Sequence, residues 1–444
     1  MVVFNNTLDI ALQIVCTWEK KDILTQVTII RDVYGKVSFL MNNMQSVSAG
    51  EEADFKLALE RDMGGFFSGR IFWKKQSGGL KHSAARVKPI IELIETERKW
   101  WKKEGDIEFY ISERPIAKKA WIADRSSQES VWPYEEAVSE NGTKVVTFYS
   151  FKGGMGRTTA LAGVVLSLVK QGKNVVMVDT DIEAPGLATL FFEEEAIERG
   201  VLDYLIERNL DSAVRIEDYV LDVVDPALLS EEDGHLFLMS AGKVDRHYLQ
   251  KLARIDYQDN RENYLRDSMA TLLKDIRESY RPDYILVDAR AGFHDLGGVT
   301  VTQLPHGVVL FGNDSRQSWD GTVQVLRTIA ERHTADFPVM IVDTMCPKRM
   351  APEFAAARER FIQKSHAICV ENYYDADVGI PGIEAVGEAH YPEMVPFNDE
   401  LLQGIELYSD GSQEGNRKVE AYKESLTGET YSRIADRMES WFGS

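Results

Sequence analysis

The chain has 444 residues, which is enough for two or three domains rather than one core. Its 71 acidic residues outnumber 51 basic ones and give a formal net charge of −20. A field of this sign repels nucleic acid and anionic membranes, so binding to either would require a local basic patch. Three widely spaced cysteines without metal-ligand spacing indicate a reducing compartment. No apolar run is long enough to cross a bilayer and the first residues do not resemble a secretion signal, so a cytoplasmic location is expected.

Residues 1–125 are expected to form a small α+β domain. Two β-rich runs flank a five-residue turn in which Gly35 can adopt a positive φ, and this pattern predicts a hairpin. The predicted elements are, in order, strands at 26–30 and 37–41, a helix at 51–61, the aromatic and basic segment 66–75, and a helix at 87–103. Residues 126–143 are polar and rich in turn formers, which predicts a linker.

From residue 144 onward, buried-strand patterns alternate with helical patterns. Strands are expected at 145–150, 174–179, 235–240, 284–288, 307–311 and 339–342, and two of the intervening helices at 158–171 and 320–332. Such alternation predicts an α/β fold in which a mostly parallel, doubly wound sheet carries helices on both faces. Residues 144–444 are therefore expected to form one domain of this class.

The segment FKGGMGRTT (151–159) stands between a predicted strand and a predicted helix. Its glycines permit the close backbone path by which amide N–H groups surround an anion, and the helix N-terminus adds partial positive charge. The predicted phosphate-binding loop comprises Lys152, Gly153, Gly154, Met155, Gly156, Arg157, Thr158 and Thr159. Within it, the Thr158 hydroxyl suits a Mg²⁺ ligand, and Thr159 suits a hydrogen bond to a phosphate oxygen. The plainer alternative is a glycine-rich turn that only caps a helix.

Aspartates follow two later strand patterns. The run VVMVDTDIEAPGL (175–187) contains Asp179 and Asp181, and YILVDARAG (284–292) contains Asp288. Because the carboxyl ends of parallel strands converge where open α/β sheets bind ligands, these side chains are expected near the loop. Carboxylates suit Mg²⁺, which is usually held with water and phosphate oxygens. One such aspartate is more often a helix cap, but three beside a phosphate loop favour a ligand site.

The lysine that begins KGG-x-G-[KR]-[ST], followed by a D-x-D strand end, resembles the deviant Walker-A P-loop ATPases, which include the ParA and MinD proteins. The resemblance implies that ATP and Mg²⁺ are the cofactors. It also implies that Lys152 reaches across a nucleotide-sandwich dimer and that Asp181 orients the attacking water. Asp179 and Asp288 would hold Mg²⁺ through water, so a few fixed charges would carry the phosphoryl chemistry.

The resemblance extends from about residue 144 to at least residue 397. The segment VPFNDELL (395–402) resembles the one that lines the adenine pocket in that family, which implies nucleotide contacts from Pro396 and Phe397. Two positions depart from the family pattern. Arg157 replaces the usual loop lysine, and arginine is planar and bulkier than lysine, which puts the hydrolysis rate in doubt. Arg290 stands where partitioning proteins usually have prolines, and it either contacts phosphate or a partner, or is a structural arginine.

Two further segments have competing interpretations. The amphipathic C-terminal segment 430–444 has balanced charges, which favours packing against a core over membrane binding. Segment 66–75 interleaves aromatic and basic residues, as single-stranded nucleic-acid sites do, but the acidic net charge and ordinary strand edges argue against this. Nucleic acid therefore stays a possible partner that the net charge does not indicate, and membrane binding is not expected.

The resulting hypothesis is a Mg²⁺-dependent ATPase of the KGG-x-GRT type that acts as a molecular switch. ATP would close a homodimer, slow and partner-stimulated hydrolysis would reopen it, and the N-terminal domain would contact a protein partner. One alternative is a nucleotide-binding regulatory subunit with little turnover, or part of a defence or partition complex. A reductase and a tyrosine autokinase are less favoured, because no bridging cysteine pair and no C-terminal tyrosine cluster is present. A ligase on the same fold would need a second-substrate pocket, which a sequence does not display.

Overall fold

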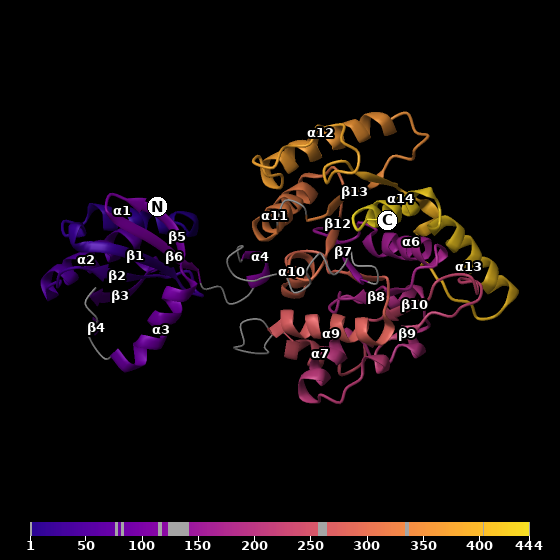
Figure 1. The fold of residues 1–444 in the computed structure, drawn as a ribbon, viewed down its shortest axis with the longest axis horizontal. Coiled ribbons are helices and arrows are strands. Elements are labelled where there is room, and N and C mark those ends of the chain that lie inside the picture. Colours follow the sequence, from indigo (N-terminus) through magenta and orange to yellow (C-terminus); the bar gives the residue numbers. More distant parts are fainter. Residues whose placement is uncertain are drawn as a thin grey trace. The chain divides into compact units, whose positions relative to one another are not determined.

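The computed structural model describes residues 2–75, 79–80, 84–113, 118–122, 142–255, 264–333, 337–402 and 404–443. They divide into two compact units, Met1–Ala117 and Lys118–Ser444 (Figure 1). The expected boundary at residue 125 is therefore shifted, because Ala120 and Trp121 are buried in the cores of the second unit. Most of the predicted linker, residues 126–141, lies outside the described residues.

The first unit is an α+β sandwich. Its sheet has the order β4-β3-β2-β1-β6-β5. The strands are β1 (Leu24–Arg31), β2 (Val37–Asn43), β3 (Phe67–Lys75), β4 (Gly79–Leu80), β5 (Lys99–Glu104) and β6 (Ile107–Glu113), and the helices are α1 (Thr7–Thr17), α2 (Ala49–Met63) and α3 (Ala84–Glu97). β1 and β2 form the predicted antiparallel hairpin, and Gly35 has a φ of 78° in its turn. Apolar side chains of α1 and α2 cover one face of the sheet, and those of α3 cover the other.

The helix predicted for residues 87–103 is wrong in its second half. α3 ends at Glu97, and the following residues form β5, which pairs antiparallel with β6. Trp100 lies opposite Tyr110 in this pairing, and Arg98 stacks on the Tyr110 ring with its Cζ 3.9 Å from the ring centroid. Aromatic residues favour strands when a partner strand is available, and that partner is not visible in the local sequence.

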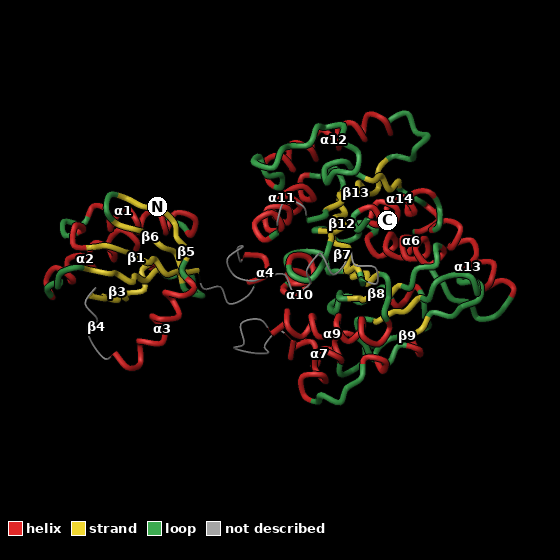
Figure 2. Tube along the Cα trace, in the orientation of Figure 1, coloured by secondary structure: helices red, strands yellow, loops and turns green. Residues whose placement is uncertain are grey.

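The second unit is a mostly parallel α/β fold, as predicted. Within the described residues, its eight strands have the order β14-β13-β12-β7-β11-β8-β10-β9, and β9–β10 is the antiparallel pair among them. Figure 2 shows strands of this unit lying between helices. The strands are β7 (Lys144–Ser150), β8 (Val175–Asp179), β9 (Leu221–Asp222), β10 (Leu236–Met239), β11 (Tyr284–Asp288), β12 (Gly307–Gly312), β13 (Val339–Cys346) and β14 (Glu393–Pro396). The inner strands are continuous apolar runs because helices cover both faces.

The described α-helices of this unit are α4 (Lys119–Ile122), α6 (Arg157–Lys170), α7 (Val201–Leu210), α8 (Tyr248–Ile255), α9 (Tyr264–Tyr280), α10 (Asp295–Thr302), α11 (Arg316–Arg332), α12 (Phe354–Asn372), α13 (Gln413–Leu426) and α14 (Glu429–Ser440). Side chains of α6, α13 and α14 share one core with one face of the sheet. Side chains of α7, α9, α10, α11 and α12 line the cores on the opposite face. β7 lies near the middle of the sheet, so the loop that follows it is supported from both sides.

The C-terminal helix packs against the core, which confirms the simpler of its two interpretations. Tyr431, Ile434 and Met438 of α14 are buried in the core that contains α6. The close approach of α14 to α6 depends on Gly163, where a Cβ atom would lie 2.6 Å from Cγ of Tyr431. Among the described residues, no helix combines the length and the apolar character that a membrane span requires.

Candidate phosphate-binding site

The loop between β7 and α6 has the backbone that the glycines predicted. Gly154 and Gly156 have φ values of 74° and 69°, a region that side chains with a Cβ rarely occupy. A Cβ atom at Gly153, Gly154 or Gly156 would meet no atom within 4 Å, so the space above the loop is open. Gly156 is also the N-cap of the 14-residue helix α6, and its carbonyl accepts the helical hydrogen bond from Ala160. The loop therefore presents a helix N-terminus and exposed backbone to that space.

Arg157 points into the carboxylates at the strand ends. Its side chain is only 9% exposed, its Nε donates to Asp288 Oδ1, and its Nη2 lies 3.5 Å from Asp181 Oδ2. Burial alone would lower the pKa of this guanidinium, but the nearby carboxylates, Asp288 above all, outweigh it and raise the pKa. Arg157 thus remains charged and bridges the ends of β8 and β11.

The Thr158 hydroxyl shares Asp288 with this arginine. Thr158 Oγ1 donates to Asp288 Oδ2 at 2.7 Å, so both oxygens of the Asp288 carboxylate accept from the first turn of α6. Asp288 is almost completely buried at the end of β11. A hydroxyl and a carboxylate oxygen therefore lie side by side at the base of the loop.

Asp179 has a different set of partners. Its two carboxylate oxygens accept from three backbone N–H groups, those of Asp181, Gly186 and Leu187, at 3.0 to 3.2 Å. Burial and the neighbouring Asp288 raise the pKa of Asp179 to about 7. These bonds fold the 181–187 segment back over the end of β8, so Asp179 shapes the segment that carries Asp181.

Asp181 lies closer to the solvent, between two arginines. Arg157 approaches one carboxylate oxygen at 3.5 Å, and Arg290 Nε lies 4.0 Å from the other. Burial raises the pKa of Asp181, and both arginines oppose that shift. The structure thus brings together Asp181 and two of the cations that the sequence placed in separate motifs.

Two residues that sequence reasoning did not select complete this group of charges. Glu183 forms an ion pair with Arg290, and its other oxygen lies 3.4 Å from His294 Nδ1. Burial and the charge of Arg290 lower the pKa of His294, which favours a neutral ring at pH 7. Glu183 and His294 could have been noticed, because each lies a few residues after a predicted strand-end aspartate.

The remaining predicted residues of the loop differ in their burial and in their contacts. Lys152 is half-buried, and within the described part of the chain its amino group has no hydrogen-bond or ion-pair partner. Thr159 is also half-buried in the first turn of α6. Met155 is buried in the core with its sulfur 3.9 Å from the Thr344 hydroxyl, so its side chain anchors the loop from below.

Pro396 and Phe397 lie at the carboxyl end of β14, on the edge of the sheet. Pro396 pairs with Cys346 of β13, and the Phe397 N–H donates to the Cys346 carbonyl at 3.1 Å. Phe397 as a whole residue is 39% exposed. These residues share the loop's edge of the sheet, although β13 and β12 lie between their strand and β7.

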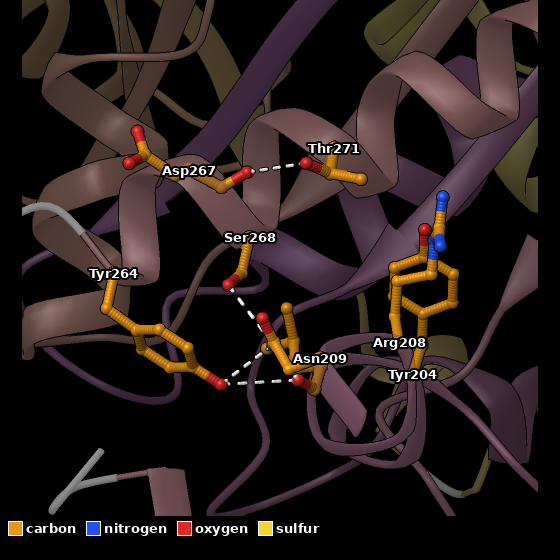
Figure 3. A pocket seen from close by; sticks show the side chains of 8 residues that line it. Tyr204, Arg208, Asn209, Tyr264, Asp267, Ser268 and Thr271 are labelled. Atoms are coloured by element: carbon orange, nitrogen blue, oxygen red, sulfur yellow. Dashed lines mark hydrogen bonds between the residues drawn. The ribbon is translucent and has the colours of Figure 1, made fainter. Parts of the chain in front are cut away.

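A separate cavity of about 290 Å³ lies between α7 and α9 (Figure 3). It contains none of the predicted site residues, and its polar groups bond largely to one another. Asn209 Nδ2, for example, donates to the Tyr264 hydroxyl at 2.9 Å, and the Thr271 hydroxyl donates to the Asp267 carbonyl at 2.9 Å. This cavity therefore offers few unsatisfied groups to a ligand.

Part of the chain that contains this loop is similar to known proteins. Residues 143–335, which include the glycine loop and all three aspartates, match the model of the AAA domain family. The septum site-determining protein MinD of Helicobacter pylori is 29% identical over 150 residues, which are 33% of this chain and 45% of that protein. An uncharacterised Borreliella burgdorferi protein is 34% identical over 73 residues, 16% of this chain and 29% of that protein.

The chain thus spans less than half the length of these curated relatives. Among solved structures, the cell division ATPase MinD of Pyrococcus furiosus superposes with a TM-score of 0.41 and 18% identity, over 67% of this chain and 98% of that one. By sequence, residues 143–335 are similar to the AAA domain family, and 150 residues of the chain are similar to the septum site-determining protein MinD.

Proposed function

We propose that the chain is a Mg²⁺-dependent ATPase that works as a nucleotide-controlled switch. The observation that carries this proposal is the open glycine loop, which leads into α6 directly above the contact between Thr158 and Asp288. Backbone N–H groups and a helix N-terminus favour phosphate, and the paired hydroxyl and carboxylate favour a hard cation beside it. The match of residues 143–335 to the AAA domain family supports the same function.

The donor set fits Mg²⁺ when phosphate and water complete its shell. Thr158 and Asp288 provide two hard oxygen donors, whereas the oxygens of Asp179 already accept three backbone bonds. In the described part of the chain, no three His, Cys, Asp or Glu side chains are grouped to hold a metal by themselves. We therefore assign the cation to Thr158 and Asp288, with Asp179 contributing through water at most. Bound there, Mg²⁺ supplies charge neutralisation of the phosphate oxygens.

The protein's own residues would divide the remaining work. Asp181 is the carboxylate best placed to orient water, because it lies at the solvent side of the strand ends. Lys152 has an amino group that no described residue engages, so it is available to phosphate, either in its own loop or in a second copy. In the proposed cycle, ATP closes a homodimer, and hydrolysis releases it.

The alternative is a nucleotide-binding regulatory subunit with little turnover. The observation that favours it is the pairing of Arg157 with Asp288 and Asp181. This pairing engages the Arg157 guanidinium and both carboxylates at the same time. Turnover would require nucleotide to displace part of this pairing. If the pairing persists, ATP binds but the water is not oriented.

Phosphate release by the full chain distinguishes these two candidates. Wild type, Asp181→Ala and Lys152→Ala are assayed with ATP, with and without Mg²⁺, and binding is measured by calorimetry. Release that needs Mg²⁺ and is lost in Asp181→Ala supports the ATPase, whereas binding without release supports the regulatory subunit. Absence of ATP binding by the wild type excludes both.

Light scattering of Asp181→Ala tests the switch itself. Because this variant is expected to bind ATP without hydrolysing it, Mg-ATP should convert monomer to dimer. An unchanged mass contradicts the dimer cycle. The first unit, for which we propose a protein partner, is kept in the protein so that its contribution is included.

A further inference from the structure

We propose that Trp121 is a positioning residue for the nucleotide site, an inference that rests on the ATPase function proposed above. Trp121 belongs to α4, precedes the first strand of the parallel sheet in the sequence, and lies outside the 143–335 region. Its side chain is nevertheless only 4% exposed, in a core that reaches the loop after β11. Trp121 holds this loop, residues 289–294, in place, and the loop carries Arg290.

The α4 segment is bonded directly to the end of that loop and to the start of α10, beside which α4 lies in Figure 1. Trp121 Nε1 donates to the His294 carbonyl at 2.7 Å. Lys118 contacts Asp295 twice, through its backbone N–H and through its amino group at 2.8 Å. The Phe293 ring packs edge-on against the Trp121 ring, with the centroids 5.1 Å apart. The loop is therefore held from its carboxyl-terminal side.

Trp121 also contacts the strand that leads into the phosphate loop. Its ring centroid is 5.7 Å from that of Tyr149 in β7, and the Tyr149 hydroxyl donates to the Gly292 carbonyl at 3.1 Å. The Phe293 ring also packs against Phe151, the residue immediately before Lys152, with the two ring centroids 4.9 Å apart. Trp121 thus contacts β7 through Tyr149, whereas its own hydrogen bond is made to the loop that follows Asp288.

The surface that receives Trp121 is shaped for it. The Thr302 hydroxyl of α10 donates to the Ala120 carbonyl at 3.1 Å, and the Thr328 hydroxyl of α11 donates to the Trp121 carbonyl at 3.2 Å. A Cβ atom at Gly298 would lie 2.8 Å from Trp121 Nε1 and 2.9 Å from the Ala120 Cβ. The neighbouring helices α10 and α11 therefore accommodate both the backbone of α4 and the side chain of Trp121 in close packing.

The functional consequence follows from Arg290. Its guanidinium pairs with Glu183 and lies 4.0 Å from Asp181, the residue proposed to orient water. If the loop loosens, Arg290 and the Asp181 environment shift, while the glycine loop that binds the phosphates keeps its own backbone. Because misplacement by about 1 Å can cost about a hundredfold in rate, kcat should fall more than nucleotide affinity.

Trp121→Phe is the sharpest test, because it removes the Nε1 bond and keeps most of the apolar bulk. Trp319→Phe is the matched control: Trp319 lies in the same core, is 5% exposed, and donates its Nε1 to Asp314 at 2.9 Å. A second pair approaches the contact from α10. Gly298→Ala should push against the indole, whereas Gly297→Ala meets nothing closer than 3.4 Å.

Two readouts are combined, hydrogen exchange of residues 289–294 without nucleotide and steady-state hydrolysis of Mg-ATP by the full chain. Trp121→Phe and Gly298→Ala should speed exchange and lower kcat at least about tenfold with little change in KM, and the controls should do neither. Unchanged exchange and kcat in Trp121→Phe overturn the positioning role, as do equal losses in Trp319→Phe. If the wild type does not hydrolyse ATP, the proposed ATPase function is wrong, and the positioning role of Trp121 is wrong as well. Normal wild-type turnover combined with unaltered variants instead refutes the role of Trp121 alone.

Discussion

Thr158 and Arg157 share the carboxylate of Asp288: the Thr158 hydroxyl donates to one oxygen at 2.7 Å, and the Arg157 guanidinium donates to the other. Both donors belong to the first turn of α6, so one strand-end aspartate ties the helix to the sheet. This arrangement couples any ligand of the loop to the ion pair beneath it.

Replacing Thr158 by valine should reduce the Mg²⁺ dependence of ATP binding. The side chain keeps its shape but loses the hydroxyl beside Asp288, so the affinity gained on adding Mg²⁺ should fall by about tenfold or more. Thr158→Ser retains the hydroxyl and serves as the control. Calorimetry with and without Mg²⁺ measures the difference, and equal Mg²⁺ dependence in both variants would exclude Thr158 from the cation site.

Replacing Arg157 by alanine should destabilise the second unit by about 3–5 kcal/mol, because buried Asp288 loses its counter-charge. Arg157→Lys keeps the charge but cannot bridge two carboxylates in the same way, so a smaller loss is expected. Arg316→Ala removes an exposed guanidinium 3.6 Å from Asp320 and should change stability by less than about 0.5 kcal/mol. Urea unfolding followed in this unit gives the ranking, and a wild-type midpoint for Arg157→Ala would contradict it.

Asp343 should make the stability of the second unit depend on pH. Burial and the neighbouring Asp314 raise the pKa of Asp343 to about 7, above the value of about 4 expected in the unfolded chain. Its stabilising contribution is therefore complete below pH 4 and is lost as the pH rises to 7. Asp343→Asn should gain up to about 4 kcal/mol over wild type at pH 8 and almost nothing at pH 4.

Unfolding of the Asp343→Asn variant across this pH range provides the measurement. Asp320→Asn, at a 70% exposed side chain, is the control and should show no comparable difference between pH 4 and pH 8. An Asp343→Asn curve parallel to the wild-type curve would mean that Asp343 titrates as in the unfolded chain.

Gly163→Ala should destabilise the protein although alanine favours helices. The new Cβ would lie 2.6 Å from Tyr431 Cγ and 2.9 Å from the Leu426 carbonyl oxygen, so α14 must shift at a cost of about 1–3 kcal/mol. Gly50→Ala in α2 meets nothing within 4 Å and should stabilise the first unit by about 0.5–1 kcal/mol. Thermal unfolding measures the change in stability of each variant, and a stabilised Gly163→Ala variant would contradict the close packing of α6 and α14.

Phe397→Ala should weaken ATP binding without changing binding of inorganic tripolyphosphate. The exposed Phe397, directly after β14, can stack on a base, whereas the triphosphate would contact only the loop. A loss of about tenfold for ATP is expected. Equal loss for both ligands would indicate a structural effect, and no loss for ATP would remove Phe397 from the nucleotide site.

Much of the site is local in sequence, which is why it could be predicted. The positive φ values of Gly154 and Gly156 follow from residue type, and the strand before the loop follows from an uninterrupted apolar run. The order of the strand-end aspartates then placed Asp181 and Asp288 at one edge of a parallel sheet. These inferences need only short-range backbone preferences and the geometry of parallel strands.

What the tertiary structure decided depends on pairs far apart in the chain. The strand β5 exists because β6 offers a partner, and a local pattern had favoured helix. Arg157 meets Asp288 across 131 residues, and Trp121 meets His294 across 173. Such contacts depend on how buried side chains fit together in three dimensions, which residue types alone do not specify. The sequence by itself determined a glycine loop and the aspartates at the strand ends, and the packing decided which of those groups engage one another.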